Sequence, residues 1–315
     1  MIKTVVTNVT NNYDHLSARS KWELFKIKVK EKSITYSVNL QKDKKDAKMK
    51  IEIELNDLTH KAKLNTQQIK RKHDIENELN HFYNEAIRGA QVRARVETIE
   101  KGEANLKYFD SIESYRQSSN VIYSLKSSDN KLFEEPATII KEMGHFYNTL
   151  YSSNQVKGND INEYLSSIGE TKQLSEQQKL SIEEMPQIHE FEDALKRMKE
   201  NKSPGYDGIP VEFYKEFWNE LTDLYVSMIK ERWENGSFPV SFNTGIISLI
   251  HKNDQRDDLK NYRPITLTNC DYKILAFVFA ERLQNVISSI VHTDQVGYIR
   301  QRFIGYSIRN IIVII

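Results

Sequence analysis

Two cations beside predicted strands are the residues in this chain best suited to bind a polyphosphate. Residues 245–251 (GIISLIH) are apolar and β-branched without alternation, which predicts a strand covered on both faces, and Lys252 follows directly. After a charged loop, Arg263 stands in the string NYRPITL (261–267), whose end predicts a second short strand. One β-hairpin therefore carries Lys252 and Arg263. Each can give a phosphate a charge-assisted hydrogen bond of about 1.5–3 kcal/mol. From spacing alone, two solvated charges beside a turn remain the alternative.

A second group of unusual residues lies in the string KSPGYDGIP, residues 202–210. It contains Gly205 and Gly208 together with Pro204 and Pro210. Glycine permits backbone conformations closed to other residues, whereas proline fixes φ, so this density predicts a loop with a defined path rather than a helix or strand.

The elements that position these groups are mostly helical. Apolar residues recur at helical spacing in 51–62 and again in 75–86, and the pattern is interrupted between them. This predicts a helical hairpin turning near Asn65, or alternatively a long arm with a poorly packed middle; the hairpin is favoured. Further patterns predict a small hairpin at 121–133 and an exposed linker at 152–167. They also predict four helices, at 189–199, 211–219, 221–233 and 271–289.

Six strings in this sequence resemble, in their order, reverse transcriptases of LINE-type (non-LTR) retrotransposons. The resemblance covers about residues 90–311, and it includes the fingers region and the segment that leads into the polymerase in the second open reading frame protein. The strings are KGEANLKYFDSI (101–112), HFYNTLYSS (145–153), SPGYDGIP (203–210), EFYKEFW (212–218), NYRPITL (261–267) and DQVGYIRQRFIGYSIRNI (294–311).

The resemblance implies an α+β fold. A mostly helical region, about residues 1–150, is expected to precede an incomplete right-hand polymerase, the fingers and the start of the palm, at residues 165–315. The implied activity of the complete relative is RNA-directed DNA synthesis, with an RNA template, a DNA primer, deoxynucleotide triphosphates and Mg²⁺. In this reading Lys252 and Arg263 bind the incoming nucleotide.

The resemblance also implies that two loops organise the fingers near the template. In the family a glycine commonly precedes the basic residue at Arg302, but Gln301 stands there in this sequence. This departure points to a degenerate copy. The implied loop residues are Ser203, Pro204, Gly205, Asp207, Gly208, Gln295, Gly297 and Arg302.

Catalysis in this family needs three carboxylates around two Mg²⁺ ions. In relatives these carboxylates follow the stretch that ends here at Ile315, and the pair Asp257-Asp258 lies in a charged loop, where solvated side chains are expected. We therefore expect no catalytic or metal-binding residues in this chain and no polymerase activity from it alone, as for a truncated or degenerate copy. Two alternatives stay open, a non-catalytic nucleic-acid-binding protein and a helical interaction protein whose basic pattern is incidental.

Composition limits the other function classes. The net charge is +1, but residues 1–100 hold 20 basic and 14 acidic residues, an excess of six, so attraction to nucleic acid is expected to be local. The lone cysteine, Cys270, excludes an intrachain disulfide and a cysteine zinc site and is expected in the core. No signal peptide and no apolar run of membrane-spanning length is present, so an intracellular protein of the cytoplasm or nucleus is expected, with no membrane partner. Nothing in the pattern predicts an oligomeric state.

Overall fold

The chain divides into two compact units, which are described separately. Unit 1 comprises residues 1–32, 147–252 and 262–315, and unit 2 comprises residues 33–146 and 253–261. Residues 1–32, which the sequence pattern groups with the helical N-terminal region, thus cluster with the C-terminal half of the chain. The computed structural model describes residues 1–94, 106–127, 131–153, 158–169, 171–252, 255–305 and 308–309.

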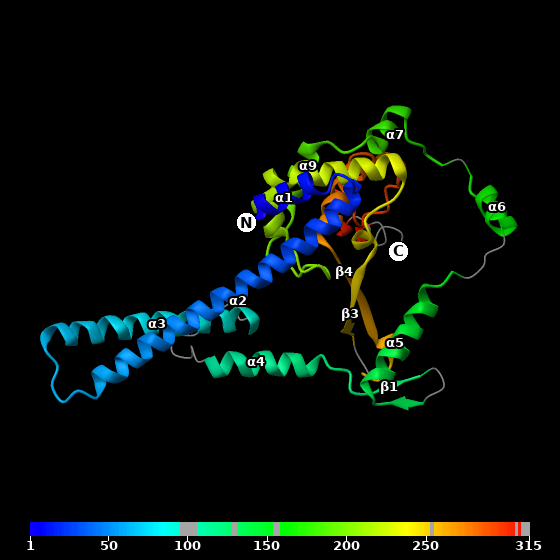
Figure 1. Cartoon of the computed structure of the whole chain (residues 1–315). Coiled ribbons are helices and arrows are strands. Elements are labelled where there is room, and N and C mark those ends of the chain that lie inside the picture. The colour runs from blue at the N-terminus through cyan, green and yellow to red at the C-terminus, as the bar shows by residue number, and fades with distance from the viewer. Residues whose placement is uncertain are drawn as a thin grey trace. The chain divides into compact units, whose positions relative to one another are not determined.

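Unit 1 is mainly helical and contains one two-stranded sheet (Figure 1). The long helix α2 (Ala18–Thr59) contributes its first part, and α5 (Pro136–Tyr151) contributes its last residues. The other elements are α1 (Ile2–Asn12), α6 (Gly158–Ser167), α7 (Glu176–Glu183), α8 (Ile188–Arg197), α9 (Val211–Asn235), the 3₁₀ helix η1 (Val240–Asn243), β3 (Gly245–His251), β4 (Tyr262–Thr268) and α10 (Cys270–Ile290).

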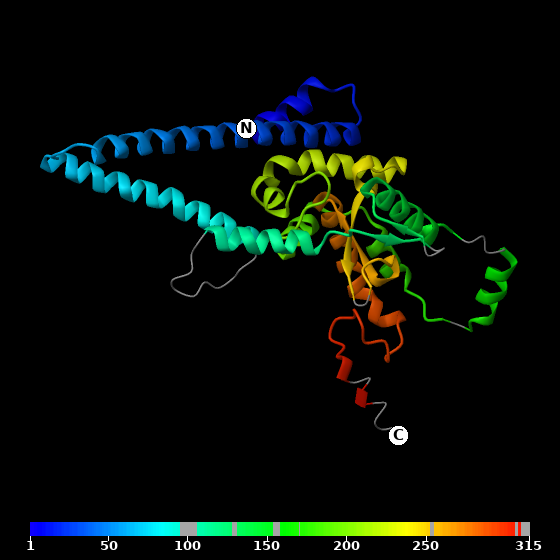
Figure 2. The same ribbon diagram turned by 90° about the horizontal axis from the view of Figure 1, so that it is seen from below.

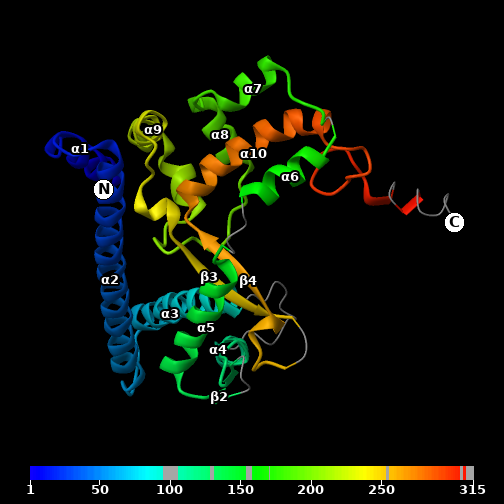
Figure 3. The same cartoon turned by 90° about the vertical axis from the view of Figure 1, so that its right-hand side faces the viewer.

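The core of unit 1 is formed by helices from distant parts of the chain. Trp22 of α2 packs against Tyr225 of α9, and Tyr225 meets the Phe191 ring of α8 edge-on, with ring centroids 5.3 Å apart in both pairs. Helix α8 lies alongside α10, as Figure 3 shows. Cys270 is buried in this core, as expected from the sequence, and burial raises the pKa of its thiol to about 11.

Helix α9 corresponds to the two helices predicted at 211–219 and 221–233. They form one helix with a kink at Phe217, whose φ of −110° and ψ of 17° depart from helical values. Among the aromatic residues of α9, Trp218 and Tyr225 are buried, whereas Trp233 is partly exposed and its ring stacks on that of Phe279, with the centroids 6.0 Å apart.

Strands β3 and β4 pair as an antiparallel hairpin, which confirms that Lys252 and Arg263 belong to one hairpin. The prediction that β3 is covered on both faces is wrong for the described residues. Most of its side chains are exposed, including Ile246, Ile247 and Ile250. The β-branched residues set the strand conformation, but a strand that pairs with only one neighbour does not thereby gain a covering layer.

Unit 2 is built around a helical hairpin formed by the later part of α2 and by α3 (Thr66–Ala94) (Figure 2). Leu58 of α2 packs against Ile75 and Leu79 of α3. The turn occurs at Asn65, whose side chain accepts a hydrogen bond from the Gln68 backbone while the Gln68 side chain accepts one from the Asn65 backbone. The predicted hairpin and its turn are therefore confirmed.

The rest of unit 2 consists of short elements. Helix α4 (Leu106–Ser119) packs Phe109 against α3, and β1 (Leu125–Lys126) pairs with β2 (Leu132–Phe133), which confirms the predicted small hairpin. The 3₁₀ helix η2 (Leu259–Asn261) lies in the part of the chain that connects β3 to β4. Residues 128–130 of the small hairpin's predicted turn lie outside the described residues.

The linker predicted at 152–167 is wrong in part. Residues 158–167 form α6, although their described side chains are exposed. Residues such as Asn162 and Leu165 are compatible with a helix. The polar composition that suggested a linker indicates exposure to solvent, and it does not determine the backbone conformation. Among the described residues, no helix combines the length and the low charge that crossing a membrane requires.

Candidate nucleotide and nucleic-acid interface

The loop at residues 203–210 depends on two glycines for different reasons. A Cβ atom on Gly205 would lie 2.1 Å from the side-chain oxygen of Asn269 and 2.6 Å from the Asn269 backbone nitrogen. Gly208 has open space around it but adopts φ of +76°, a left-handed conformation that is costly for other residues. The predicted loop path thus rests on one close approach and one backbone conformation. Ser203 is exposed at the start of the loop and Pro204 is half-buried.

A buried ion cluster, formed by Lys26, Asp207 and Asp271, holds this loop against helices α2 and α10. Lys26 Nζ lies 3.1 Å from Asp207 Oδ2 and 2.9 Å from Asp271 Oδ2, and it donates a 2.7 Å hydrogen bond to Ser241 Oγ. All three ammonium protons therefore have an acceptor.

Neighbouring donors satisfy the remaining oxygens of the buried ion cluster. Trp22 Nε1 donates to Asp271 Oδ2 at 2.8 Å, and the Tyr272 backbone donates to Asp271 Oδ1 at the same distance. The Ile209 backbone donates to Asp207 Oδ1 at 3.1 Å. Each carboxylate oxygen thus accepts at least one hydrogen bond, as buried charges require.

The charges within the cluster are not balanced one to one, because a single ammonium faces two carboxylates. Burial penalises the charge on Lys26, but attraction to and hydrogen bonding with Asp271, aided by Asp207, raise the Lys26 pKa above its ordinary value. Burial raises the pKa of Asp207, and the nearby Lys26 offsets that effect only in part. Asp207, expected near the template, is thus buried and makes its contacts inside the protein.

The hairpin presents its two cations at the end where β3 stops. Arg263 lies opposite Ile250 in the ladder, and Lys252 follows the last residue of β3, His251. Both cationic side chains are exposed. No ion pair of Arg263 is found within the part of the chain that the structure describes. Beside them, the His251 and Tyr262 rings pack with centroids 5.2 Å apart, which fixes the backbone at the base of the cation pair.

The structure does not bring the 203–210 loop and the cation pair together. Gly205 packs on Asn269, which directly follows β4, whereas Arg263 lies near the other end of that strand. Asn269 lies six positions after Arg263, about 20 Å along an extended strand. The two groups therefore lie at opposite ends of β4.

The stretch 295–302 is a turn closed by Arg302. Its guanidinium donates to the carbonyl oxygens of His292 and Gln295 at 2.5 and 2.8 Å, and to that of Val291 at 3.3 Å, so it caps the end of α10. Gln301 adopts φ of +65°, where glycine is favoured, which explains why a glycine suits this place. Gly297 and Gln295 are exposed.

Sequence reasoning missed Lys26, the residue that organises the buried ion cluster. The available signal was that Lys26 shares a helical face with Trp22 and Val29, where a lysine is rarely placed without a partner. Its partners lie 181 and 245 residues away and could not be named from spacing.

The carboxylates described here do not fit a magnesium site. A buried ammonium lies between Asp207 and Asp271 and would repel a divalent cation. Asp257, expected to be solvated, is instead half-buried, and its Oδ2 lies 2.7 Å from Lys126 Nζ, which holds the pKa of Asp257 below its usual value. That expectation is wrong because it assumed that no other part of the chain contacts this charged loop. Within the described ranges, no group of three or more metal-binding side chains was found.

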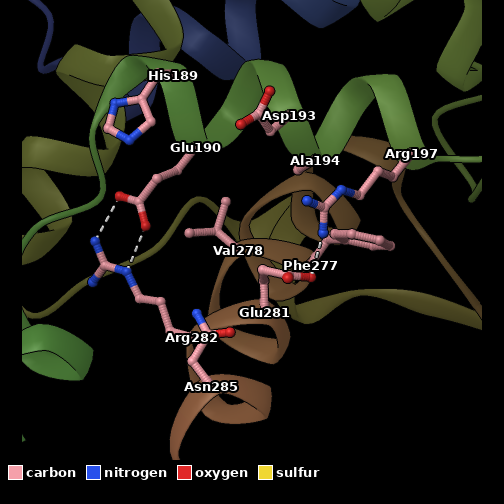
Figure 4. Close-up of a pocket in the computed structure, with 10 residues that line it drawn as sticks. All are labelled: His189, Glu190, Asp193, Ala194, Arg197, Phe277, Val278, Glu281, Arg282 and Asn285. Carbon is pink, nitrogen blue, oxygen red and sulfur yellow. Dashed lines mark hydrogen bonds and ion pairs between the residues drawn. The ribbon is translucent and has the colours of Figure 1, made fainter. Parts of the chain in front are cut away.

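A pocket of about 270 Å³ lies between α8 and α10 (Figure 4). Most of the charged side chains that line this pocket form ion pairs with one another. Arg282 donates two hydrogen bonds to Glu190, at 2.7 and 2.6 Å, and the Arg197 guanidinium lies 2.7 Å from Glu281. Hydrogen bonds from Arg300 and Arg197 lower the Glu281 pKa to about 2. These pairs tie the helices together and leave little unpaired charge to attract a ligand.

No family model matches the chain. It is similar to two curated proteins of mobile elements. The uncharacterized 149 kDa protein of transposon TX1 from Xenopus laevis is 30% identical over 208 residues, which are 66% of this chain and 16% of that protein. The retrovirus-related Pol polyprotein from type-1 retrotransposable element R1 of Bradysia coprophila is 27% identical over 106 residues, 33% of this chain and 11% of that protein. The chain thus spans less than a fifth of the length of either relative.

Proposed function

The chain is related to proteins of non-LTR retrotransposons, and from that premise we propose that it supplies the fingers region of an RNA-directed DNA polymerase. In this proposal the β3–β4 hairpin binds the phosphates of an incoming deoxynucleotide triphosphate. The 203–210 loop and the 295–302 turn support the fingers near the RNA template. The partners are an RNA template and a DNA primer, and Mg²⁺ assists the complete polymerase.

The observation that supports the proposal is the exposed position of Lys252 and Arg263 on one hairpin. Two cations at one end of a paired strand can engage adjacent phosphates, with Arg263 supplying a planar fork and Lys252 a compact charge. Because β3 and β4 are hydrogen-bonded over seven residues each, little ordering is needed on binding.

Equilibrium dialysis with a labelled deoxynucleoside triphosphate tests the proposal. We expect Arg263→Ala and Lys252→Ala each to weaken binding about 10- to 150-fold, which corresponds to one lost charge-assisted hydrogen bond. Lys179→Ala, which removes an exposed cation on α7, serves as the matched control and is expected to bind as the unsubstituted chain does. Equal affinity for all four proteins would remove the hairpin from the nucleotide site.

A second candidate function is nucleic-acid binding without catalysis. It is supported by the excess of six basic residues in 1–100. Many of those cations already have acidic partners, such as Lys44 with Glu85 and Arg71 with Glu54, which limits the attraction. Binding of single-stranded RNA across a salt series distinguishes the candidates, because contacts with phosphates make log affinity fall linearly with log salt. Binding of RNA together with no measurable triphosphate binding would favour this second function.

A further inference from the structure

Helix α6 has an apolar face that no described part of its own chain covers. Ile161, Tyr164 and Leu165 stand at positions i, i+3 and i+4 of the helix and therefore share one face. Their exposed fractions are 47%, 68% and 57%. Among the described residues, the side-chain hydrogen bonds of α6 stay within the helix, and no ion pair or ring contact joins it to another element. The apolar face of α6 is therefore available to another molecule.

The length of α6 makes this exposure unfavourable. The helix has ten residues, and isolated helices shorter than about 12–15 residues are only marginally stable in water. Most of the stability of a helix in a protein comes from packing its apolar face against a neighbour. A surface that covers the apolar face of α6 would therefore stabilise the helix itself.

Helix α2 has a second apolar face, on the side away from α3. Ile51 of α2 packs toward α3. Met49 and Ile53 each lie two positions from Ile51, about 200° around the helix axis. Ile34 and Val38 lie on the same side as Met49, and all four residues are more than half exposed. We call Ile34, Val38, Met49 and Ile53 the outer face of α2.

Lysines occupy the middle of the outer face of α2. Lys42 and Lys45 follow Val38 by four and seven residues, so they lie on the same side of the helix. Both are exposed, and no ion pair of either is found in the part of the chain that the structure describes. Residues 34–50 hold five lysines and two acidic residues. The outer face therefore combines apolar side chains with an excess of positive charge.

Helix α6 is complementary to this face in charge and in length. Residues 158–169 contain Asp160 and Glu163 and no lysine, arginine or histidine. Opposite charges favour the pairing of two surfaces, and like charges oppose it. Val38 and Met49 lie about 16 Å apart along α2, and a helix of ten residues is about 15 Å long. One α6 helix can therefore span the distance from Val38 to Met49.

We propose that α6 of one copy of this chain docks on the outer face of α2 of a second copy. The apolar face of α6 packs against Val38 and Met49, and the negative charge of α6 lies beside Lys42 and Lys45. Because each copy carries both surfaces, two copies can exchange two such contacts. This self-association goes beyond the proposed function and uses no residue of the triphosphate-binding hairpin.

Pairing of like surfaces is less favourable than this exchange. An antiparallel pair of α2 helices that matches Val38 with Met49 places Lys42 opposite Lys45, and a parallel pair in register places each lysine opposite itself. Two α6 helices bring together two acidic segments without a cation between them. Like charges placed opposite each other disfavour both arrangements. The contact between α6 and α2 avoids both repulsions.

Sedimentation equilibrium of the full chain across a range of concentrations tests the proposal. We expect the average mass to rise with concentration. We expect Leu165→Gln and Val38→Gln each to weaken association about 10- to 150-fold, the effect of one aliphatic side chain that is no longer buried. Glutamine is a good helix former, and far-UV circular dichroism checks that each variant keeps its helices. The matched control is Ile140→Gln on α5, which removes an isoleucine that is 68% exposed and is expected to leave association unchanged.

Mixing the two variants tests which surfaces meet. Leu165→Gln keeps an intact outer face of α2, and Val38→Gln keeps an intact α6. We therefore expect an equal mixture to associate more tightly than either variant alone, because one of the two exchanged contacts is restored. We also expect association of the unsubstituted chain to weaken as salt is added, since salt screens the attraction between the two helices.

Several results would overturn the proposal. A monomer at every concentration would exclude self-association, and an equal loss in Ile140→Gln would show that the association is not specific to these faces. An effect of Val38→Gln without one of Leu165→Gln would indicate pairing of two α2 helices, and the reverse would indicate pairing of two α6 helices. No gain on mixing would also exclude the exchange. Lys252 and Arg263 are intact in all these variants, so triphosphate binding measured in parallel tests the proposed function independently.

Discussion

The buried ion cluster of unit 1 and the exposed ion pairs of the unit 2 hairpin use the same residue types with different consequences. In the cluster, the exposed side-chain fractions are 5% for Lys26, 6% for Asp207 and 0% for Asp271. In the hairpin, Arg71 and Glu54 are 44% and 43% exposed. Water can solvate the hairpin charges if they separate, but it cannot reach the cluster charges. The difference predicts that the cluster specifies one loop position, whereas the hairpin pairs adjust stability only slightly.

The positions of the tryptophans allow the two regions to be followed separately. All three, Trp22, Trp218 and Trp233, lie in unit 1. Tryptophan fluorescence therefore reports the unfolding of unit 1, and far-UV circular dichroism reports both units. Trp22 is the most informative of them, because its indole donates a hydrogen bond into the buried ion cluster.

Replacing Lys26 has the largest expected effect. Lys26→Met leaves Asp207 and Asp271 buried without their cation, and we expect the free energy of unfolding of unit 1 to fall by about 3–5 kcal/mol. Urea denaturation followed by tryptophan fluorescence measures it. Lys30→Met, one turn further along α2 at an exposed position, is the control and is expected to change stability by less than about 0.5 kcal/mol. A similar small change for Lys26→Met would mean that the cluster does not stabilise the loop.

Substituting Gly205 tests whether the loop that the cluster holds has room to move. In Gly205→Ala the added methyl group overlaps Asn269, so we expect a loss of about 1–3 kcal/mol in the same denaturation experiment. Gly208→Ala meets no atom and strains only the backbone, which costs about 1 kcal/mol. If Gly208→Ala proved the more harmful of the two, the close approach to Asn269 would not be the constraint that fixes this loop.

The ion pair of Glu190 and Arg282 is expected to contribute less to stability than the buried ion cluster and more than the exposed pairs of the hairpin. It can be tested by changing the pH. Hydrogen bonds from Arg282 lower the folded-state pKa of Glu190 below its ordinary 4.5. The stabilisation is therefore present above pH 4.5 and is lost as the pH falls through that lower pKa. We expect Glu190→Gln to cost about 1–2 kcal/mol at pH 7 and the difference from the unsubstituted chain to shrink below pH 4.5.

The control for this pH test is Asp193→Asn on the same helix. Asp193 pairs with Lys196 in an exposed position. The substitution is expected to have almost no effect at either pH. A pH-independent loss in Glu190→Gln would show that packing, and not the ion pair, links α8 to α10.

Replacing Arg71 has the smallest expected effect. Arg71 donates two hydrogen bonds of 2.8 Å to Glu54 across the helical hairpin, but both side chains remain in water. We expect Arg71→Ala to lower the stability of unit 2 only slightly, with a smaller loss at high salt. Circular dichroism during thermal unfolding measures the change, with Lys70→Ala as the control. A loss as large as that of Lys26→Met would remove the distinction between the two regions.

Sequence patterns predicted the parts of the fold that depend on nearby residues. The turn at Asn65, the α10 helix and the pairing of β3 with β4 all follow from periodicity or turn composition within a few residues. Sequence patterns could not reveal the burial of Asp207 or the capping role of Arg302, because both depend on contacts that form only in the folded chain. Sequence patterns also could not predict the exposure of β3, because an apolar strand has the same sequence pattern whether or not another layer covers it.

The candidate site, too, could be predicted only where its residues are close in the sequence. Lys252 and Arg263 could be assigned to one hairpin because the strands and their connection are local.

The uncovered isoleucines of β3 have a consequence for the behaviour of the protein at high concentration. Each strand of a two-stranded sheet leaves one edge of backbone amides and carbonyls unsatisfied, and an apolar edge of this kind can template intermolecular pairing. Pro264 removes one donor from β4 and so discourages pairing there, whereas β3 contains no proline. Fibrillar self-association at high concentration is therefore expected to begin along β3.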